Sequence, residues 1–391
     1  MFCVLLIRFI TSAPFSLVSP EYTASRLSIF QRVVDLYRTC KTALRWERGG
    51  KREIRTANGE EGAAGEQGKQ LKGRKWGGEN MSTCDIAHVP PLEERMEEGR
   101  DLHLCTTLRI ERKDVGETGM IFLTSTLVNT QCHLLELWLD NIGMNERELQ
   151  VMFQVFSQNR SVKVLSLSNN ILTARGLRRI GEGLSNRRSP LLSLRLMSCS
   201  LGRPQAASLV TVLRSTPSLT SLNLDNNPLG DAGLRILVPA LAYPGSRLRT
   251  LRLSTAGLTA ASGREIGSIL RGNARLRTLA LNYNRLLSEG VRGMCSVLPG
   301  TRSRLMRLEL EENRLDDRCS HQLAESCNAH LSLTALCLSR NSFTNHALPS
   351  FLRLCGVSPC LRYLWLSRNS ISFEGANSLQ DSVPARVTVF V

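Results

Sequence analysis

Residues 219–247 read LTSLNLDNNPLGDAGLRILVPALAYPGSR, and this stretch decides the fold. It opens with the pattern L-x-x-L-x-L-x-x-N-x-L, and its alternating leucines predict a short strand with one buried face. Its second half carries Leu234, Leu237 and Leu241, which recur at the spacing of one helix face. The stretch therefore predicts a strand, a turn and a helix, each with one apolar side.

The same pattern recurs at a nearly constant period along most of the chain. Its copies begin at Leu134, Val162, Leu191, Leu219, Leu248, Leu276, Leu305, Leu333 and Leu361. The spacing is 28 or 29 residues throughout, and a weaker copy at Cys105 brings the number of repeats to ten. A period of this size with this strand pattern is typical of a leucine-rich repeat solenoid, in which each repeat is buried by its neighbours.

A longer period of 57 residues covers most of the array. Fifteen residues after each start, large and small side chains mostly alternate, as at Leu177, Ala206, Leu234 and Gly263. This alternation resembles ribonuclease inhibitor and the repeat domains that end NOD-like receptors, over residues 105–391. The resemblance implies an α/β horseshoe, with parallel strands on the concave face and helices on the convex face.

The resemblance also implies a structural role for the asparagine of the motif, whose side chain would bind backbone groups at the turn. These residues are Asn170, Asn227, Asn284, Asn313, Asn341 and Asn369. Cys199 takes the position once, as the resembled family allows, whereas Ile142 and Ala256 depart from the pattern. The ladder is therefore in doubt at those two repeats.

The N-terminal quarter shows no repeat. In residues 1–48, apolar residues such as Leu27, Phe30 and Val34 recur at helical spacing, and we expect an amphipathic helix. Residues 49–83 are rich in Gly, Lys and Glu and are expected to form a disordered linker. We expect residues 84–104 to cap the stack, which leaves residues 105–391 as the repeat domain.

Composition narrows the functional classes. The net charge is +16, and residues 101–391 carry 34 basic against 21 acidic residues, which favours anionic partners. The twelve cysteines show no zinc-ligand spacing. Several of them hold apolar repeat positions, which favours buried thiols in a reducing compartment and hence the cytoplasm, whereas Cys337 is expected to face outward. No stretch is long and apolar enough to span a membrane, and no nucleophile–base set or metal cluster stands out. We therefore expect no enzyme and no cofactor.

A partner-binding surface is expected on the concave face, because the residue between the two strand leucines points away from the core. This row is Arg109, Trp138, Ser166, Arg195, Asn223, Arg252, Ala280, Glu309, Cys337 and Trp365. Exposed Trp, Tyr and Arg dominate binding energy at interfaces. The predicted contact residues are Trp138, Asp140, Arg195, Arg252, Arg307, Glu309, Glu311, Tyr363 and Trp365.

Two rows of arginine form a further feature. Arg247, Arg249, Arg275, Arg277 and Arg304 lie at or near the strand starts and are expected to bind anions. A second row on the helices, which includes Arg178, Arg235, Arg264 and Arg292, is interpreted as a solvated face. Aromatic residues do not interleave with the strand-start row, which favours an acidic protein over nucleic acid as the partner.

The sequence thus predicts a protein-binding scaffold or recognition module without a small-molecule substrate. Two alternatives stay open, namely a regulator of an enzyme, either ribonuclease inhibitor-like or GTPase-activating, and a truncated NOD-like receptor-type sensor. Binding a basic ribonuclease calls for an acidic concavity, whereas these repeats are expected to be basic there. The long acidic stretch of the GTPase-activating family is missing, as is the nucleotide-binding module of the receptors.

Overall fold

The computed structural model describes residues 106–111, 115, 120–121, 123–124, 127–128, 134–185, 190–299, 303–330 and 332–391. All described residues belong to the unit Ile86–Val391. The predictions for residues 1–48, 49–83 and 84–104 therefore fall outside the described residues.

The described strands form one parallel sheet in which each strand pairs with the next one along the chain, in the order β1 to β11. Their bounds are Thr107–Glu111 (β1), Glu136–Asp140 (β2), Val164–Ser166 (β3), Ser193–Arg195 (β4), Ser221–Asn223 (β5), Thr250–Arg252 (β6), Thr278–Ala280 (β7), Arg307–Glu309 (β8), Ala335–Cys337 (β9), Tyr363–Trp365 (β10) and Thr388–Phe390 (β11). The first ten strands start two residues after the predicted repeat starts, which confirms the repeat pattern.

A helix follows almost every strand and lies on the outer side of the array. The bounds are Glu146–Gln158 (α5), Ala174–Ser185 (α6), Arg203–Ser215 (α7), Gly230–Leu241 (α8), Gly263–Gly272 (α9), Leu287–Ser296 (α10), Ser320–His330 (α11), Leu348–Val357 (α12) and Phe373–Ser382 (α13). Short 3-10 turns precede three of them, at Ala260–Ser262 (η2), Asp317–Cys319 (η3) and Asn345–Ala347 (η4).

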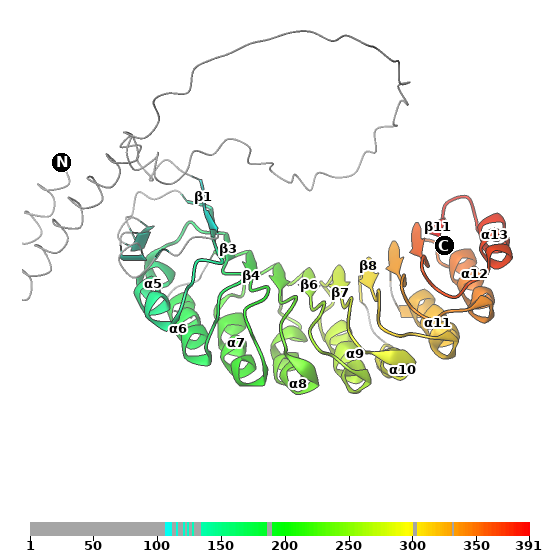
Figure 1. The fold of residues 1–391 in the computed structure, drawn as a ribbon, viewed down its shortest axis with the longest axis horizontal. Helices are drawn as coiled ribbons and strands as arrows, with labels where there is room; N and C mark the ends of the chain where they lie inside the picture. Colours follow the sequence, from blue (N-terminus) through cyan, green and yellow to red (C-terminus); the bar gives the residue numbers. More distant parts are fainter. Residues whose placement is uncertain are drawn as a thin grey trace, which may run out of the picture. The chain divides into compact units, whose positions relative to one another are not determined.

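The repeats bend into an arc with the strands inside and the helices outside (Figure 1). Paired strands lie about 4.8 Å apart, whereas packed helices need about 8–10 Å, so the outer layer must be longer than the inner one. The predicted α/β horseshoe is confirmed, with the sheet on the concave face and the helices on the convex face.

The core is a continuous aliphatic layer between strands and helices. The three motif leucines of a repeat are buried, as at Leu219, Leu222 and Leu224, which are at most 4% exposed. The predicted inner helix positions are buried as well, for example Leu237 and Leu241. Since each buried leucine contributes roughly 1.5–3 kcal/mol, stacked repeats are stabilised chiefly by this layer.

The predicted asparagine ladder is present, and each asparagine serves the preceding repeat. The Asn227 side chain accepts from the backbone N–H groups of Cys199 and Leu201, at 2.9 and 3.0 Å, and donates to the carbonyl of Leu196. Where the pattern departs, the next asparagine still supplies the acceptor: Asn170 receives the N–H of Ile142, and Asn284 that of Ala256. Ala256 itself, however, offers no side-chain acceptor to the preceding turn, where the N–H of Leu229 donates to the carbonyl of Asn227 instead. The ladder is therefore interrupted at that repeat.

Candidate binding surface

The predicted concave row lies on one line across the sheet. Backbone pairing places Arg109 opposite Trp138, and the line continues through Ser166, Arg195 and Asn223 to the later strands. It ends beyond Trp365 at Phe390, which the row predicted from sequence does not include. The sequence could have placed Phe390 in this row, because the alternation of Val387 and Val389 indicates a strand whose valines face the core and whose Phe390 faces outward.

An aromatic cluster occupies the C-terminal end of this line. We call Tyr363, Trp365, Phe390 and Arg307 the C-terminal aromatic patch. The rings of Trp365 and Phe390 stack with centroids 5.4 Å apart, and those of Tyr363 and Trp365 stack at 5.6 Å. The Arg307 guanidinium lies 5.5 Å from the Trp365 ring centroid, within the range of a cation–π contact. Tyr363 and Phe390 remain 38% and 39% exposed.

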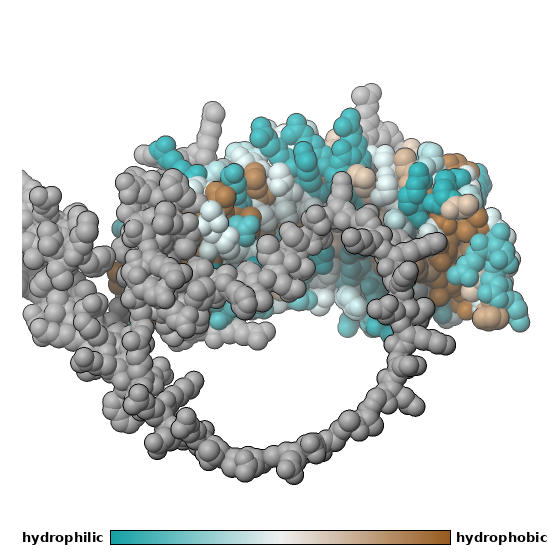
Figure 2. All heavy atoms as spheres, turned by 90° about the horizontal axis from the view of Figure 1, so that it is seen from above, coloured by the Kyte–Doolittle hydropathy of each residue, from teal (hydrophilic) through white to brown (hydrophobic). Residues whose placement is uncertain are grey.

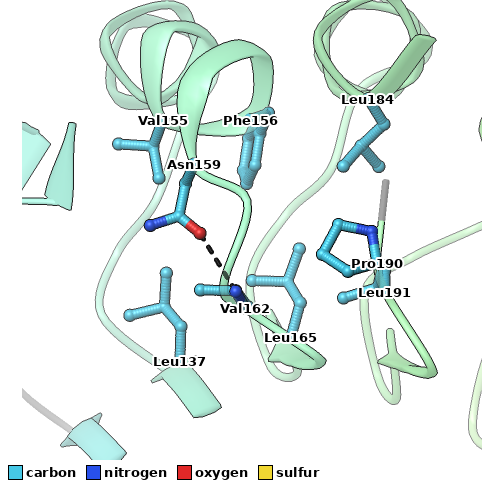
Figure 3. Close-up of a pocket in the computed structure, with 9 residues that line it drawn as sticks. All are labelled: Leu137, Val155, Phe156, Asn159, Val162, Leu165, Leu184, Pro190 and Leu191. Atoms are coloured by element: carbon cyan, nitrogen blue, oxygen red, sulfur yellow. Dashed lines mark hydrogen bonds between the residues drawn. The ribbon is translucent and has the colours of Figure 1, made fainter. Parts of the chain in front are cut away.

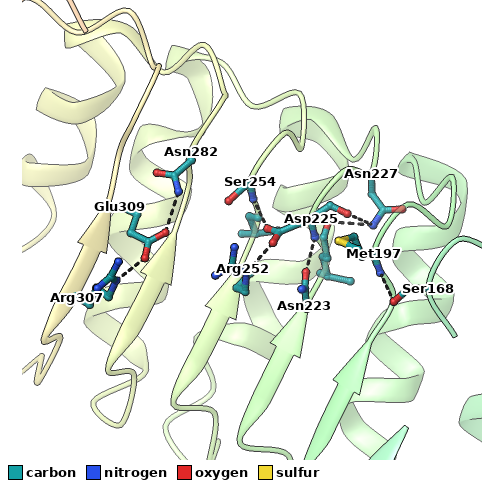
Figure 4. Close-up of polar contacts among 12 residues, drawn as sticks. Ser168, Met197, Asn223, Asp225, Asn227, Arg252, Ser254, Asn282, Arg307 and Glu309 are labelled. Carbon is teal, nitrogen blue, oxygen red and sulfur yellow. Dashed lines mark hydrogen bonds and ion pairs between the residues drawn. The ribbon is translucent and has the colours of Figure 1, made fainter. Parts of the chain in front are cut away.

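Arg307 is held in place by a polar network of Glu309 on its own strand β8 and Asn282, which follows β7 (Figure 4). Its Nε donates to the carboxylate of Glu309, which also accepts from Asn282 Nδ2 at 2.8 Å. Glu309 is only 8% exposed. The predicted contact residue Glu309 thus lies below the surface, where it positions Arg307 beside the aromatic rings.

A second aromatic group lies at the N-terminal end of the concave face. Trp138 is flanked by the guanidinium groups of Arg109 and Arg195, which lie 4.3 and 5.0 Å from its ring centroid. Its indole N–H donates to Glu136 at 3.1 Å. The sequence predicts Trp138 and Arg195 as separate contacts, and the structure brings them together across Ser166.

The middle of the concave face is polar and lined by short side chains. Ser166, Asn223 and Ala280 are all buried, so larger neighbours form the surface there. Figure 2 looks down on the strand side and shows hydrophilic residues across the middle and hydrophobic ones toward the C-terminal end. Arg252 donates to Asp225 at 2.7 Å, and Asp225 also accepts from the backbone of Ser254 (Figure 4).

Three rows of side chains face the concave side, namely the first and third residues of each three-residue strand and the equivalent residue two positions later. These concave rows are not basic, which corrects the expectation from sequence. They carry four arginines and six carboxylates, namely Arg109, Arg195, Arg252, Arg307, Glu111, Glu136, Asp140, Asp225, Glu309 and Glu311. Arg109 pairs with Glu111, Arg252 with Asp225 and Arg307 with Glu309. Net charge is summed over all faces of a chain, and here the excess arginine lies on the edges and helices.

The other predicted carboxylates are also engaged. Asp140 accepts from the hydroxyl of Ser166 and the backbone of Ser168, at 2.6 and 2.8 Å. Glu311 pairs with Arg340 at 3.2 Å. Arg340 is exposed and was not among the predicted contact residues. These carboxylates order the surface around them, so they are not free charges.

Most of the described cysteines are buried, as the sequence predicts for apolar fillers, whereas Cys360 is exposed. Cys199, Cys295, Cys319 and Cys355 are buried, and burial raises their pKa, for Cys199 to about 12. Cys337 faces the concave side, and partial burial raises its pKa too. A thiol with a raised pKa is a poor nucleophile at neutral pH. Among the described residues, no group of His, Cys, Asp and Glu is placed to hold a metal ion.

The space between α5, α6 and the starts of their strands holds a small apolar cavity of about 20 Å³ (Figure 3). Leu137, Phe156, Leu165 and Leu184 line it. Asn159 contributes its amide, whose oxygen accepts from the backbone of Val162 at 3.0 Å (Figure 3). A cavity of this size has room for about one water molecule, so it is a packing gap between repeats.

The strand-start arginines lie together along one edge of the sheet. Arg247, Arg249, Arg275 and Arg304 are exposed, and Arg277 is half-buried. On the helix layer, by contrast, Arg235 pairs with Glu265 at 3.1 Å.

Among the helices that the structure describes, none is both long and apolar enough to cross a lipid bilayer.

The fold and this face define a leucine-rich repeat module for binding another molecule. A family model described as Leucine Rich repeat matches residues 216–237. Ribonuclease inhibitor of Sus scrofa is 30% identical over 313 residues, 73% of this chain and 69% of that protein. The chain therefore belongs to the leucine-rich repeat proteins of the ribonuclease-inhibitor type.

Two further relatives cover a similar part of the chain. Ribonuclease inhibitor of Mus musculus is 29% identical over 281 residues, 72% of this chain and 62% of that protein. NACHT, LRR and PYD domains-containing protein 3 of Macaca mulatta is 31% identical over 289 residues, 73% of this chain but only 28% of that protein. The chain thus matches less than a third of this larger relative. The family model and these relatives indicate no enzyme family.

Proposed function

We propose that this chain is a protein-binding scaffold that holds its partner on the concave strand face, with the C-terminal aromatic patch as the main anchor. The observation that carries the proposal is the stacked Tyr363–Trp365–Phe390 cluster with Arg307 over it. Trp, Tyr and Arg are the residue types that supply most binding energy at protein interfaces. The Trp138 group, with Arg109 and Arg195, is a second anchor in this proposal.

Folding gives no reason for aromatic residues at these positions. The inward residue of β10 is Leu364, which is fully buried and joins the core. On the neighbouring strand β9, Tyr363 and Trp365 pair with the small residues Ala335 and Cys337. Thr250 and Asn223 hold the equivalent positions on β6 and β5. Stacking on Phe390 helps to hold the last strand, yet more than a third of Tyr363 and Phe390 stays exposed, and this is surface that a partner would cover.

The test is quantitative affinity capture from a native-cell lysate, with the full chain as bait and mass spectrometry as the readout. The test variant is Trp365→Ala with Phe390→Ala. The matched control is Phe373→Ala, because Phe373 is 80% exposed at the start of α13 and lies outside the strand face. Thermal unfolding of all three proteins verifies that each is folded.

The proposal expects a protein that the wild-type chain and the Phe373→Ala control retain equally and that the double variant loses. Its affinity, measured with the purified partner by calorimetry, should fall at least about 30-fold, which corresponds to the loss of a hot spot of 2 kcal/mol or more. Equal retention by the folded double variant would show that the patch does not bind the partner.

A second candidate function is the regulation of an enzyme, which the 30% identity to a ribonuclease inhibitor supports. The paired carboxylates of the concave rows speak against a strongly basic enzyme as the target. A third candidate is a sensor of the NOD-like receptor type, supported by the match to the repeat region of a NACHT-containing protein. Both alternatives use the same face, and the captured partner distinguishes them.

A further inference from the structure

We infer that a second surface binds a short acidic segment of a partner protein. This surface lies at the residues that directly precede strands β6, β7 and β8. We call Arg247, Arg249, Arg275, Arg277 and Arg304 the arginine edge. This surface is separate from the C-terminal aromatic patch, and the inference does not rest on that patch.

The backbone fixes these arginines in register. The N–H of Arg249 donates to the carbonyl of Thr220, and the N–H of Arg277 donates to the carbonyl of Arg249, both at 2.7 Å. Arg249 and Arg277 are therefore direct neighbours across two adjacent strands of the sheet. Arg247, Arg275 and Arg304 each directly precede a buried leucine, so they share the next position outward in three successive repeats.

The five charges lack a counter-charge among the residues that the structure describes. Within the described part of the chain, no Asp or Glu forms an ion pair with any of them, whereas Arg109, Arg252 and Arg307 on the concave face are all paired. The segments 242–249, 273–277 and 303–306 contain no acidic residue at all. One guanidinium is fixed by the backbone, since Arg277 Nη1 donates to the carbonyl of Arg304 at 3.1 Å.

The fold does not require arginine here. Arg249 and Arg277 each directly precede a strand. The equivalent position is held by Leu192 and Thr220 in the preceding repeats and by Thr334 later in the array. Five like charges at the starts of three adjacent strands repel one another, so this arrangement opposes folding. Interspersed charges of both signs would keep the surface soluble without that repulsion. An anionic ligand that bridges the guanidinium groups offsets it.

The dimensions favour a short acidic peptide over nucleic acid. Three adjacent strands that lie about 4.8 Å apart span about 10 Å from the first to the third, which is the length of roughly three extended residues. Single-stranded nucleic acid is bound along several nucleotides with aromatic side chains stacked on the bases. Tyr243, an exposed aromatic residue four positions before Arg247, lies against Gly245. Arginine forks also match carboxylates in a bidentate manner.

The experiment measures binding of a fluorescein-labelled hexaglutamate peptide to the full chain by fluorescence anisotropy, at 30 and 150 mM NaCl. The test variant is Arg249→Glu with Arg277→Glu. The matched control is Arg264→Glu with Arg292→Glu, which makes the same change in net charge at two exposed helix positions. We expect the test variant to bind at least about tenfold more weakly than the control, and wild-type affinity to fall with salt.

Three outcomes decide the inference. Equal weakening by both variants means that the peptide senses net charge only, and overturns it. Tight binding of a labelled oligothymidylate that the edge variant removes, without peptide binding, assigns the edge to nucleic acid instead. Retention of peptide binding by Trp365→Ala is expected, so failure of the aromatic patch is distinguishable from failure of the edge. If the glutamate variant does not fold, Arg249→Gln with Arg277→Gln replaces it.

Discussion

At the scale of single residues, the motif asparagine determines how one repeat is joined to the next. Asn227 is 1% exposed and satisfies two backbone N–H groups of the preceding repeat, those of Cys199 and Leu201. Both N–H groups are buried at the turn. Water reaches neither group, so this turn depends on the single amide of Asn227.

Replacement of this amide should weaken the array strongly. Asn227→Ala leaves two buried N–H groups without an acceptor, each of which costs about 1–3 kcal/mol. We expect the free energy of unfolding, measured by urea denaturation, to fall by about 2–4 kcal/mol. Cys199→Ala is the matched control at the same ladder position. Its thiol only contacts the carbonyls of Leu167 and Met197, and we expect a loss of about 1 kcal/mol or less. Equal losses in the two variants would contradict this account.

The residue scale also shows what sequence predicts and what it does not. A period of two fixes which residues face the concave side, and the row from Arg109 to Trp365 is confirmed by strand register. Contacts between side-chain ends do not follow from spacing. Arg195 reaches Trp138 across an intervening strand, and Glu309 is drawn under Arg307, because side-chain rotamers and short neighbours decide these contacts. Composition cannot separate faces, which is why the concave rows were expected to be basic.

At the scale of elements, the 57-residue period has a packing cause at the α9–α10 contact. A Cβ atom at Gly263 would meet the carbonyl oxygen of Gly290. A large residue at this helix start is excluded because α10 lies directly against it. The equivalent position in the next repeat, Val291, is large and buried. The alternation seen in the sequence is therefore an alternation in how closely neighbouring helix starts approach.

This contact predicts a sharp difference between two glycine substitutions. Gly263→Ala forces α9 and α10 apart, and we expect a loss of at least about 1–3 kcal/mol in the free energy of unfolding. Gly356→Ala in α12 meets no atom within 4 Å, and we expect no loss or a gain of up to about 1 kcal/mol from helix propensity. Thermal and urea unfolding measure both. A neutral Gly263→Ala would refute the packing explanation of the period.

Turn η3 supplies a prediction on pH. Its N-cap Asp316 accepts from the Arg318 backbone and from the hydroxyl of Ser288, and hydrogen bonds from the Arg318 guanidinium lower the pKa of Asp316 to about 2. A depressed carboxylate pKa stabilises the fold above the unfolded pKa near 4, and this contribution is lost as the pH falls from about 4 to 2. Asp316 is about one-third exposed, so we expect at most about 1 kcal/mol.

The measurement compares wild type with Asp316→Asn, which keeps an oxygen acceptor for the cap but does not titrate. The difference in unfolding free energy between the two proteins should shrink as the pH is lowered from 5 toward 2.5. The corresponding turn η4 has the uncharged Thr344 as its N-cap. Thr344→Ser keeps the hydroxyl that donates to Asp317 and serves as a control that leaves every titrating group in place. A constant difference across the range would rule out the Asp316 contribution.

At the scale of the whole molecule, the repeats separate the surface into regions of different chemistry. Two aromatic groups lie on β2 and β10, toward the two ends of the sheet, with a polar middle between them. The unpaired arginines lie outside the concave rows, along one edge. A partner that uses both the C-terminal aromatic patch and the arginine edge must present an apolar contact next to an acidic segment. This combination selects a class of partner that neither surface defines alone.

The same distribution of charge makes a prediction about the family relationship. Inhibition of a basic ribonuclease would need many unpaired carboxylates on the concave face, but Glu111, Asp225, Glu309 and Glu311 are each paired with an arginine. Only Glu136 and Asp140 among the six carboxylates of the concave rows lack such a partner within the described residues. The arginine edge would also repel a basic enzyme. We expect no inhibition of a basic pancreatic-type ribonuclease at a tenfold molar excess of the full chain, with the inhibitor of Sus scrofa as the positive control. The assay follows cleavage of a fluorogenic RNA substrate. Stoichiometric inhibition would show that the arginines move away from their carboxylates on binding, and the chain would then be assigned to enzyme regulation.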